Sequence, residues 1–310
     1  MGLFSWLRGQ RTPKGRDQLA AALPPASAVT EAPPLRVVET RKRRFSLHSD
    51  DLFDLTRTAV LHDLFALPPE RRDDDWHRRF FDAAWHGSAE LPAPTAFTGP
   101  DGFPYLRFDL PRGGAFEAQS IGNLARSLVD NATGAAIFAS PDDPADAPQF
   151  VFSMGRLDAM LRFDDPAGDP VDADAGARPV DEAVYAVDQR NGHQALTVRA
   201  SHQVMIGAPS SEYLPPATAR ALYRHLVQGW GIAEPRVAVM VDPALRPSRS
   251  LIVNRRRDGF GAGQDPDGAA RMLLWYMMPT QTIMLLPDTI TEQQLVPLSG
   301  YLGEGAPAND

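Results

Sequence analysis

The feature that most constrains the fold of this chain is an acidic, proline-rich stretch near its middle. Residues 164–183, DDPAGDPVDADAGARPVDEA, carry almost no large apolar side chains, and their prolines and glycines interrupt any helix or strand. A segment of this composition cannot bury enough apolar surface to join a core. We therefore expect a solvated acidic linker here, with one folded domain before it at 46–163 and another after it at 184–303.

The two ends of the chain are expected to be disordered. Residues 1–45 hold nine basic and three acidic side chains, and their prolines prevent a long helix. Residues 304–310 form a second short tail. The basic cluster at 41–44 and the apolar side chains near the start suggest weak contact with an anionic surface, so a peripheral membrane protein is one alternative. A solvated tail is the simpler interpretation.

The absence of two residue types excludes several kinds of chemistry. The only lysines are Lys14 and Lys42, and the chain has no cysteine. From residue 46 onward there is therefore no phosphate-loop lysine, no Schiff-base lysine, no thiolate nucleophile and no disulfide. The same part of the chain has a net charge of −14, which should repel nucleic acid because phosphate contacts dominate that binding.

Nothing in the sequence indicates a membrane span or a secreted protein. No apolar run approaches the roughly 20 residues that cross a bilayer. The first ten residues, MGLFSWLRGQ, lack the longer apolar core and the cleavage site of a signal peptide. We expect a cytoplasmic protein.

The first domain begins with two helices. Ser49 is a suitable N-cap for a helix that ends before Pro68 and Pro69. The three aspartates at 73–75 precede the next helix and suit its N-cap and first turn, which is a simpler explanation than an acidic catalytic cluster. Gly87 is placed to follow the end of that helix.

Strand patterns follow in the first domain. A turn at Asp101–Gly102 leads into alternating residues at 105–108, and a short helix at 121–128 precedes the apolar strand AAIFAS. Strand character resumes at 150–152. The expected class is α+β.

The second domain begins with a hairpin at Asn191–Gly192. A strand, a helix started by Pro215 or Pro216, two strands, a helix within 265–278, a strand and a short C-terminal helix follow. This βαββαβα order, preceded by the hairpin, predicts a mixed sheet with helices packed on one face.

Part of the second domain resembles a known family. The segments QVMIGAPSSEYLPPATARALYRHL, GIAEPRVAVMVD and SLIVN are similar to the C-terminal domain of the enhanced-serine-sensitivity (SseB) family of bacterial proteins. In that family too, a strand ending in Ile-Gly precedes a proline-led helix, an apolar strand and a hairpin strand. The resemblance implies an α/β regulatory or interaction domain and no transferable active site.

The loop after residue 253 is the first candidate site. Arg255, Arg256 and Arg257 precede Gly261 in NRRRDGFGAGQD and suggest contact with an anion or with an acidic protein surface. The glycine spacing does not match a dinucleotide fingerprint, and Asp265 and Asp267 occupy the helix start where a phosphate would bind. The simpler interpretation is a loop whose following helix is capped by Asp265 or Asp267.

The second candidate is the apolar segment 272–278. Trp275, Met277 and Met278 would form a hydrophobic contact for a partner if part of Met277–Met278 is exposed. An ordinary core segment is the alternative that we favour.

We expect no catalytic residues, metal or cofactor. No histidines have zinc spacing, Asp172, Asp174 and Gly176 do not have the register of a calcium loop, and no serine has the spacing of a nucleophile elbow. The preferred function is a non-catalytic bacterial interaction or regulatory module with a protein partner. The alternative is a hydrolase or anion-binding transferase that uses the 255–263 loop.

Overall fold

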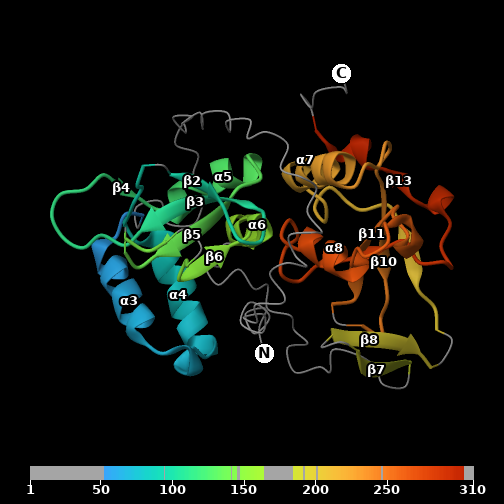
Figure 1. Cartoon of the computed structure of the whole chain (residues 1–310), viewed down its shortest axis with the longest axis horizontal. Coiled ribbons are helices and arrows are strands. Elements are labelled where there is room, and N and C mark those ends of the chain that lie inside the picture. The colour runs from blue at the N-terminus through green and yellow to red at the C-terminus, as the bar shows by residue number, and fades with distance from the viewer. Residues whose placement is uncertain are drawn as a thin grey trace.

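The computed structural model describes residues 52–93, 95–140, 142–144, 147–163, 184–190, 193–199, 202–245 and 247–303. The expectations for 1–45, 164–183 and 304–310 lie outside these ranges. Figure 1 shows two halves side by side, each with its own sheet and helices. The class is α+β with mixed sheets, as the sequence predicted.

The first half is built on a sheet with strand order β4-β1-β3-β5-β6, and β2 pairs with β3. Only β3 and β5 run parallel; the other pairs are antiparallel. A parallel pair needs a crossover, and α5 supplies it. The elements are α3 (Leu55–Ala66), η2 (Pro69–Arg71), α4 (Asp74–His86), β1 (Ala89–Glu90), β2 (Ala96–Thr98), β3 (Pro104–Asp109), β4 (Ala118–Gln119), α5 (Ile121–Asp130), β5 (Gly134–Phe138), β6 (Phe150–Phe152) and α6 (Met154–Phe163).

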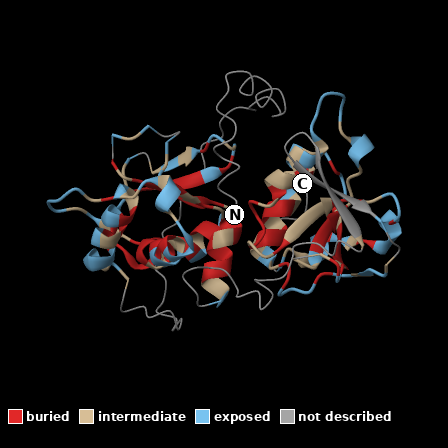
Figure 2. Cartoon of the chain, turned by 90° about the horizontal axis from the view of Figure 1, so that it is seen from below, coloured by how far each residue is buried: buried red, intermediate tan, exposed pale blue. Residues whose placement is uncertain are grey.

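Buried aromatic rings fill this half. Phe80 of α4 stacks on Trp76 with ring centroids 4.8 Å apart, and it also contacts Phe150 and Phe152 of β6. Phe80, Phe108 and Phe152 are fully buried. Figure 2 shows buried residues in the interior of each half and exposed ones toward the outer ends. The apolar stripe of α4 thus fixes that helix against the sheet.

Local signals explain the helix ends, with two corrections. The first described helix, α3, starts at Leu55, where Asp54 caps it by accepting from Thr56 N at 2.8 Å. The expected cap, Ser49, lies outside the described residues, and Phe53, with a φ of 69°, is not helical. Asp73 caps α4 as expected. Gly87 ends α4 with φ −66°, not in the left-handed form; it is glycine because a Cβ would lie 2.5 Å from Ala83 O.

One helix was missing from the sequence prediction. The sequence prediction assigned no element to residues 154–163, but they form α6, and Arg156 N donates to Ser153 Oγ at its start. The buried face of α6 includes Met154, Leu157 and Met160, spaced three apart. The strand before it ends at Phe152.

The second half has strand order β12-β11-β10-β13, and β9 also pairs with β10. Only β11 and β12 run parallel, with α8 as their crossover. The elements are β7 (Tyr185–Arg190), β8 (His193–Val198), β9 (Met205–Gly207), α7 (Pro216–Arg224), η3 (His225–Gly229), β10 (Arg236–Val241), β11 (Arg249–Val253), η4 (Arg257–Gly259), α8 (Pro266–Leu273), β12 (Thr282–Leu285), η5 (Glu292–Gln294), β13 (Val296–Pro297) and η6 (Leu298–Tyr301).

Most of the predicted order is confirmed in this half. The β7–β8 hairpin pairs Arg190 with His193, and Pro215 and Pro216 start α7. The prediction of a C-terminal helix is wrong. Residues 292–301 form two 3₁₀ turns, and β13 lies between them and pairs with β10. Pro297 explains the interruption, since it disfavours helical backbone at Val296.

Candidate functional site

The two halves meet at the segment that joins α8 to β12. The indole Nε1 of Trp275 donates to the hydroxyl of Tyr105 at 2.7 Å, and that hydroxyl donates to Asp101 Oδ2 at 2.5 Å. Burial raises the pKa of Asp101, an effect that the hydrogen bond from Tyr105 partly offsets. A buried hydrogen-bond chain therefore crosses the boundary.

Aromatic packing strengthens the same contact. The ring of Phe103 lies 4.4 Å from that of Trp275 with an interplanar angle of 5°, and it meets Tyr276 edge-on at 5.5 Å. Aromatic pairs of this kind contribute about 1 kcal/mol beyond the area they bury. Across the boundary, α5 and α7 also contact each other.

The start of α6 fits against the backbone of the same segment. Gly155 N donates to Trp275 O at 3.0 Å, and a Cβ at Gly155 would collide with the backbone of Met277. At the other end of α6, Arg162 donates to Glu212 O and to Met278 Sδ. Both ends of α6 thus hold the second half.

This packing decides whether the apolar segment 272–278 can serve as a contact surface for a partner. Trp275, Met277 and Met278 are 8%, 2% and 7% exposed, because they pack between the two halves. The contact surface expected there required exposure of Met277 or Met278, and that condition is not met. The segment is part of a core, the alternative that the sequence favoured.

The three arginines of the 255–263 loop do not converge on a common point. Arg256 donates to Pro287 O and Ile290 O and pairs with Asp288, so it holds the following loop. Arg257 forms two hydrogen bonds to Asp267, at 2.9 and 2.6 Å. Arg256 and Arg257 thus already have partners within the chain.

The remaining members of that loop are also engaged. Arg255 lies over the ring of Phe260 at 5.0 Å, but its buried Nε has no hydrogen-bond partner in the described ranges. Gly261 N donates to Gln264 Oε1. Asp265 caps α8 by accepting from Asp267 N, as the simpler interpretation expected. Internal contacts hold the loop in place, and its described residues do not form an anion-binding site.

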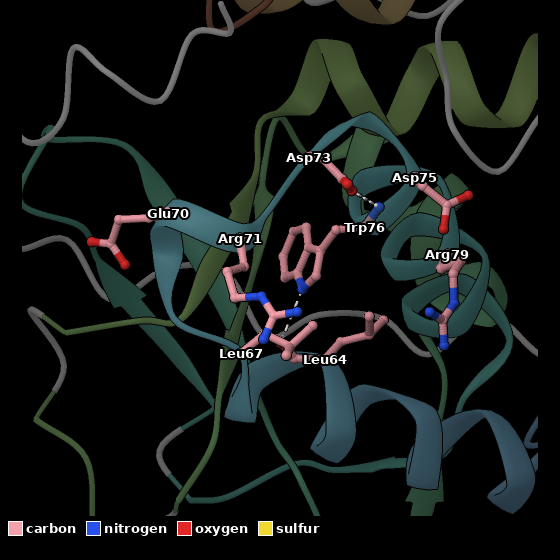
Figure 3. A pocket seen from close by; sticks show the side chains of 8 residues that line it. All are labelled: Leu64, Leu67, Glu70, Arg71, Asp73, Asp75, Trp76 and Arg79. Carbon is pink, nitrogen blue, oxygen red and sulfur yellow. Dashed lines mark hydrogen bonds between the residues drawn. The ribbon is translucent and has the colours of Figure 1, made fainter.

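A hollow of about 320 Å³ lies between the end of α3 and the start of α4. Figure 3 shows Trp76 at its centre, with the carboxylates of Glu70 and Asp75 on opposite sides of it. Trp76 Nε1 donates to Leu64 O, and Asp73 serves as the cap of α4. These side chains stabilise the helix pair and do not form a reactive group.

A second hollow, of about 300 Å³, lies at the boundary between the halves. The first half contributes Pro104, Asn131 and Ala132, and the second half contributes Arg224, His225, Gln228 and Tyr276. Sites between two packed units are common places for small-molecule binding. This hollow is the candidate functional site.

His225 is the central polar group of the site. Its Nδ1 lies 3.1 Å from the hydroxyl of Tyr276, and the rings of Phe103, Trp230 and Tyr276 surround it at 5.6–6.5 Å. Burial lowers the pKa of His225 to about 4 and raises the pKa of Tyr276. At neutral pH both side chains are therefore uncharged.

Backbone irregularities line both sides of the hollow. After α7 the chain makes a π-helical turn over His225–Gly229, a feature that is frequent at functional sites. On the facing side, Ala132 has φ 51°; Ala132 N donates to Val129 O and Thr133 N to Leu128 O. This is a Schellman motif with alanine where glycine is usual.

Sequence reasoning did not find this site. Ala132, His225 and Tyr276 are far apart in the chain, and none of them belongs to a local motif. The one available signal was the pair Gly229 and Gly231 around Trp230, which marks an irregular helix end. Only the packing of the two halves brings these residues together.

Two further findings hold for the described ranges alone. Within them, no three histidine, aspartate or glutamate side chains gather closely enough to hold a metal ion. No helix there is long and apolar enough to cross a membrane.

Comparisons with known proteins give no family. No protein-family model matches the chain, and neither the curated proteins nor the solved structures give a significant match. The resemblance to the enhanced-serine-sensitivity family stays a prediction.

Proposed function

We propose that the protein is a non-catalytic regulatory module of the bacterial cytoplasm that acts by binding a partner protein. The resemblance of 203–254 to the enhanced-serine-sensitivity family supports a regulatory role. The enzyme alternative relied on the 255–263 loop, where Arg256 and Arg257 already have internal partners and Arg255 alone has an unpartnered nitrogen. The membrane alternative relied on residues outside the described ranges.

The observation that carries the proposal is the exposed edge strand β9. Among the described residues, β9 pairs with β10 alone, so one row of its backbone groups faces outward. Met205 is 66% exposed and Val204 is 37% exposed. A Cβ at Gly207 would have no atom within 4 Å. The strand therefore offers unpaired backbone and apolar side chains in open space.

An extended apolar segment of a partner protein fits this edge. Such a segment can add a strand to an exposed sheet edge, with backbone hydrogen bonds supplying affinity and side-chain contacts supplying specificity. Natural edge strands are protected from this pairing by short length, as β9 with its three residues is, or by a charge or a proline. Residues 204–207, VMIG, have neither.

Photo-crosslinking tests the proposal. A photo-reactive residue at Met205 should capture a protein in the bacterium, whereas one at Phe163, an exposed apolar residue of the first half, should not. A synthetic peptide from the captured segment should bind the purified protein, and Met205→Lys should weaken it at least about tenfold. Equal capture at both positions, or a peptide affinity unchanged by Met205→Lys, would overturn the proposal.

A further inference from the structure

The hollow at the boundary differs in charge from the rest of the molecule. Among the described residues that line it, Arg224 is the one formally charged side chain, and no aspartate or glutamate is present. The chain as a whole has a net charge of −8. A positively charged hollow in an acidic protein favours an anionic occupant.

The hydrogen-bond chemistry of His225 indicates an acceptor in that occupant. Within the described ranges, Nδ1 of His225 is the one hydrogen-bond partner of the Tyr276 hydroxyl, so we assign the hydroxyl as the donor. A neutral imidazole that accepts at Nδ1 carries its proton on Nε2. His225 lines the hollow, and Gly229 beside its ring has no side chain to cover Nε2. The Nε2–H is therefore available as a donor.

Two further donors lie on the same side. Arg224 and Gln228 are four residues apart, a spacing that places both side chains on one face of a helical turn. Both are exposed, both line the hollow, and no hydrogen bond or ion pair engages either side chain in the described part of the chain. Arg224 lies close enough to Tyr276 for its charge to oppose the rise in the pKa of that hydroxyl. Guanidinium and imidazole N–H groups suit a carboxylate.

The opposite side of the hollow is apolar. Pro104 and Ala132 of the first half contribute small apolar groups there, beside Asn131, whose amide donates to Ser127 O. Glycine at position 132 would relieve the strain of the left-handed backbone conformation that Ala132 adopts. Ala132 lines the hollow, where its methyl group would contact the body of a ligand.

We propose that this hollow binds a small organic carboxylate, with the carboxyl group at Arg224 and His225 and an apolar body against Pro104 and Ala132. A volume of about 300 Å³ is at the lower end of the range for small-molecule sites, so the ligand is compact. This site is separate from the β9 edge, and either proposal can fail without the other.

Calorimetric titration of the full chain with sodium benzoate, at constant ionic strength, tests the site. Benzamide has the same shape without the charge and serves as the matched ligand. Benzoate should bind with a dissociation constant of about 1 mM or below, and benzamide should bind at least about tenfold more weakly.

Two variants separate the parts of the proposal. Arg224→Gln should weaken benzoate at least about tenfold and leave benzamide unchanged, whereas Arg78→Gln, an exposed arginine of the first half, should change neither. Ala132→Gly should weaken both ligands about two- to fivefold while stabilising the fold, because it removes a ligand contact and relieves the backbone.

Three results would overturn the proposal. The first is no detectable binding of benzoate at a ligand concentration 20-fold above about 1 mM. The second is equal affinity for benzoate and benzamide. The third is an affinity for benzoate that Arg224→Gln leaves unchanged. Circular dichroism and melting of each variant establish that it is folded, so a loss of binding reports the site.

Discussion

Trp275 Nε1 and the Tyr105 hydroxyl, 170 positions apart in the chain, form a buried 2.7 Å hydrogen bond across the boundary between the two halves. The hydroxyl also donates to Asp101, so one oxygen satisfies two buried partners. Removing that oxygen leaves the buried indole N–H without its partner, and Asp101 keeps the hydrogen bond from Phe103 N but loses the one from Tyr105. The Tyr105 hydroxyl therefore contributes to the stability of the boundary.

Tyr105→Phe should lower the free energy of unfolding by about 2 kcal/mol, since the buried indole N–H loses its partner and Asp101 loses one of its donors. Urea denaturation measures this. Tyr301→Phe is the control, because no hydrogen bond of that hydroxyl occurs within the described ranges, and it should change stability by less than about 0.5 kcal/mol. A Tyr105→Phe effect as small as that of the control would mean that the hydrogen-bond chain contributes nothing.

Gly155→Ala should destabilise the chain by more than about 2 kcal/mol, because the new methyl group collides with the backbone of Met277. Gly300→Ala is the matched control: a Cβ there meets no atom within 4 Å, and the change should be neutral or slightly stabilising. Thermal melting of the two variants side by side gives the comparison. Similar melting temperatures would contradict the close approach of α6 to residue 277.

The pKa of His225 predicts a specific pH dependence. The unfolded side chain takes up a proton near its ordinary pKa of 6.5, whereas the folded one does so only near about 4. Protonation of the unfolded state therefore lowers the free energy of unfolding as the pH falls from about 7 to 4. The total decrease is about 3 kcal/mol. At pH values above 7 this contribution vanishes.

The raised pKa values of Asp101, Asp109 and Asp158 act in the opposite direction, so the difference between two proteins is the useful quantity. Subtracting the stability of His225→Gln from that of the wild type, pH by pH, cancels those carboxylates. The difference should fall by about 3 kcal/mol between pH 7 and pH 4. A difference that is flat with pH would show that the imidazole is not held neutral.

Ala132→Gly should stabilise the protein by about 1 kcal/mol, because Ala132 has a left-handed φ of 51° that costs alanine more than glycine. Chemical denaturation of the single variant measures the gain. Ala125→Gly, in the buried interior of α5, is the control and should be destabilising. Loss of stability in Ala132→Gly would mean that the methyl group contributes more packing than the backbone strain costs.

Much of the fold follows from local sequence. Asp73 before Trp76 predicts the start of α4, the proline pair before Ala217 predicts α7, and alternation with apolar runs places β10 and β11. These signals succeed because caps, prolines and periodicity act over a few residues.

Other parts depend on contacts between distant residues, and the sequence did not reveal them. The apolar segment 275–278 has the composition of either a surface or a core, and only the position of Gly155 and Phe103 decides for the core. The boundary hollow needs Ala132 to meet His225 and Tyr276. The Asp54 cap was missed because Ser49 gave an equally good local signal.

Cutting the chain between its halves tests most directly whether the contact at 275–278 joins them. A protease site inserted within 164–183 allows one cut after folding, followed by size-exclusion chromatography without denaturant. The two fragments should co-elute at the position of the intact chain, and Gly155→Ala should make them separate. Fragments of the wild-type chain that elute apart would contradict the joined arrangement, and with it the site at the boundary.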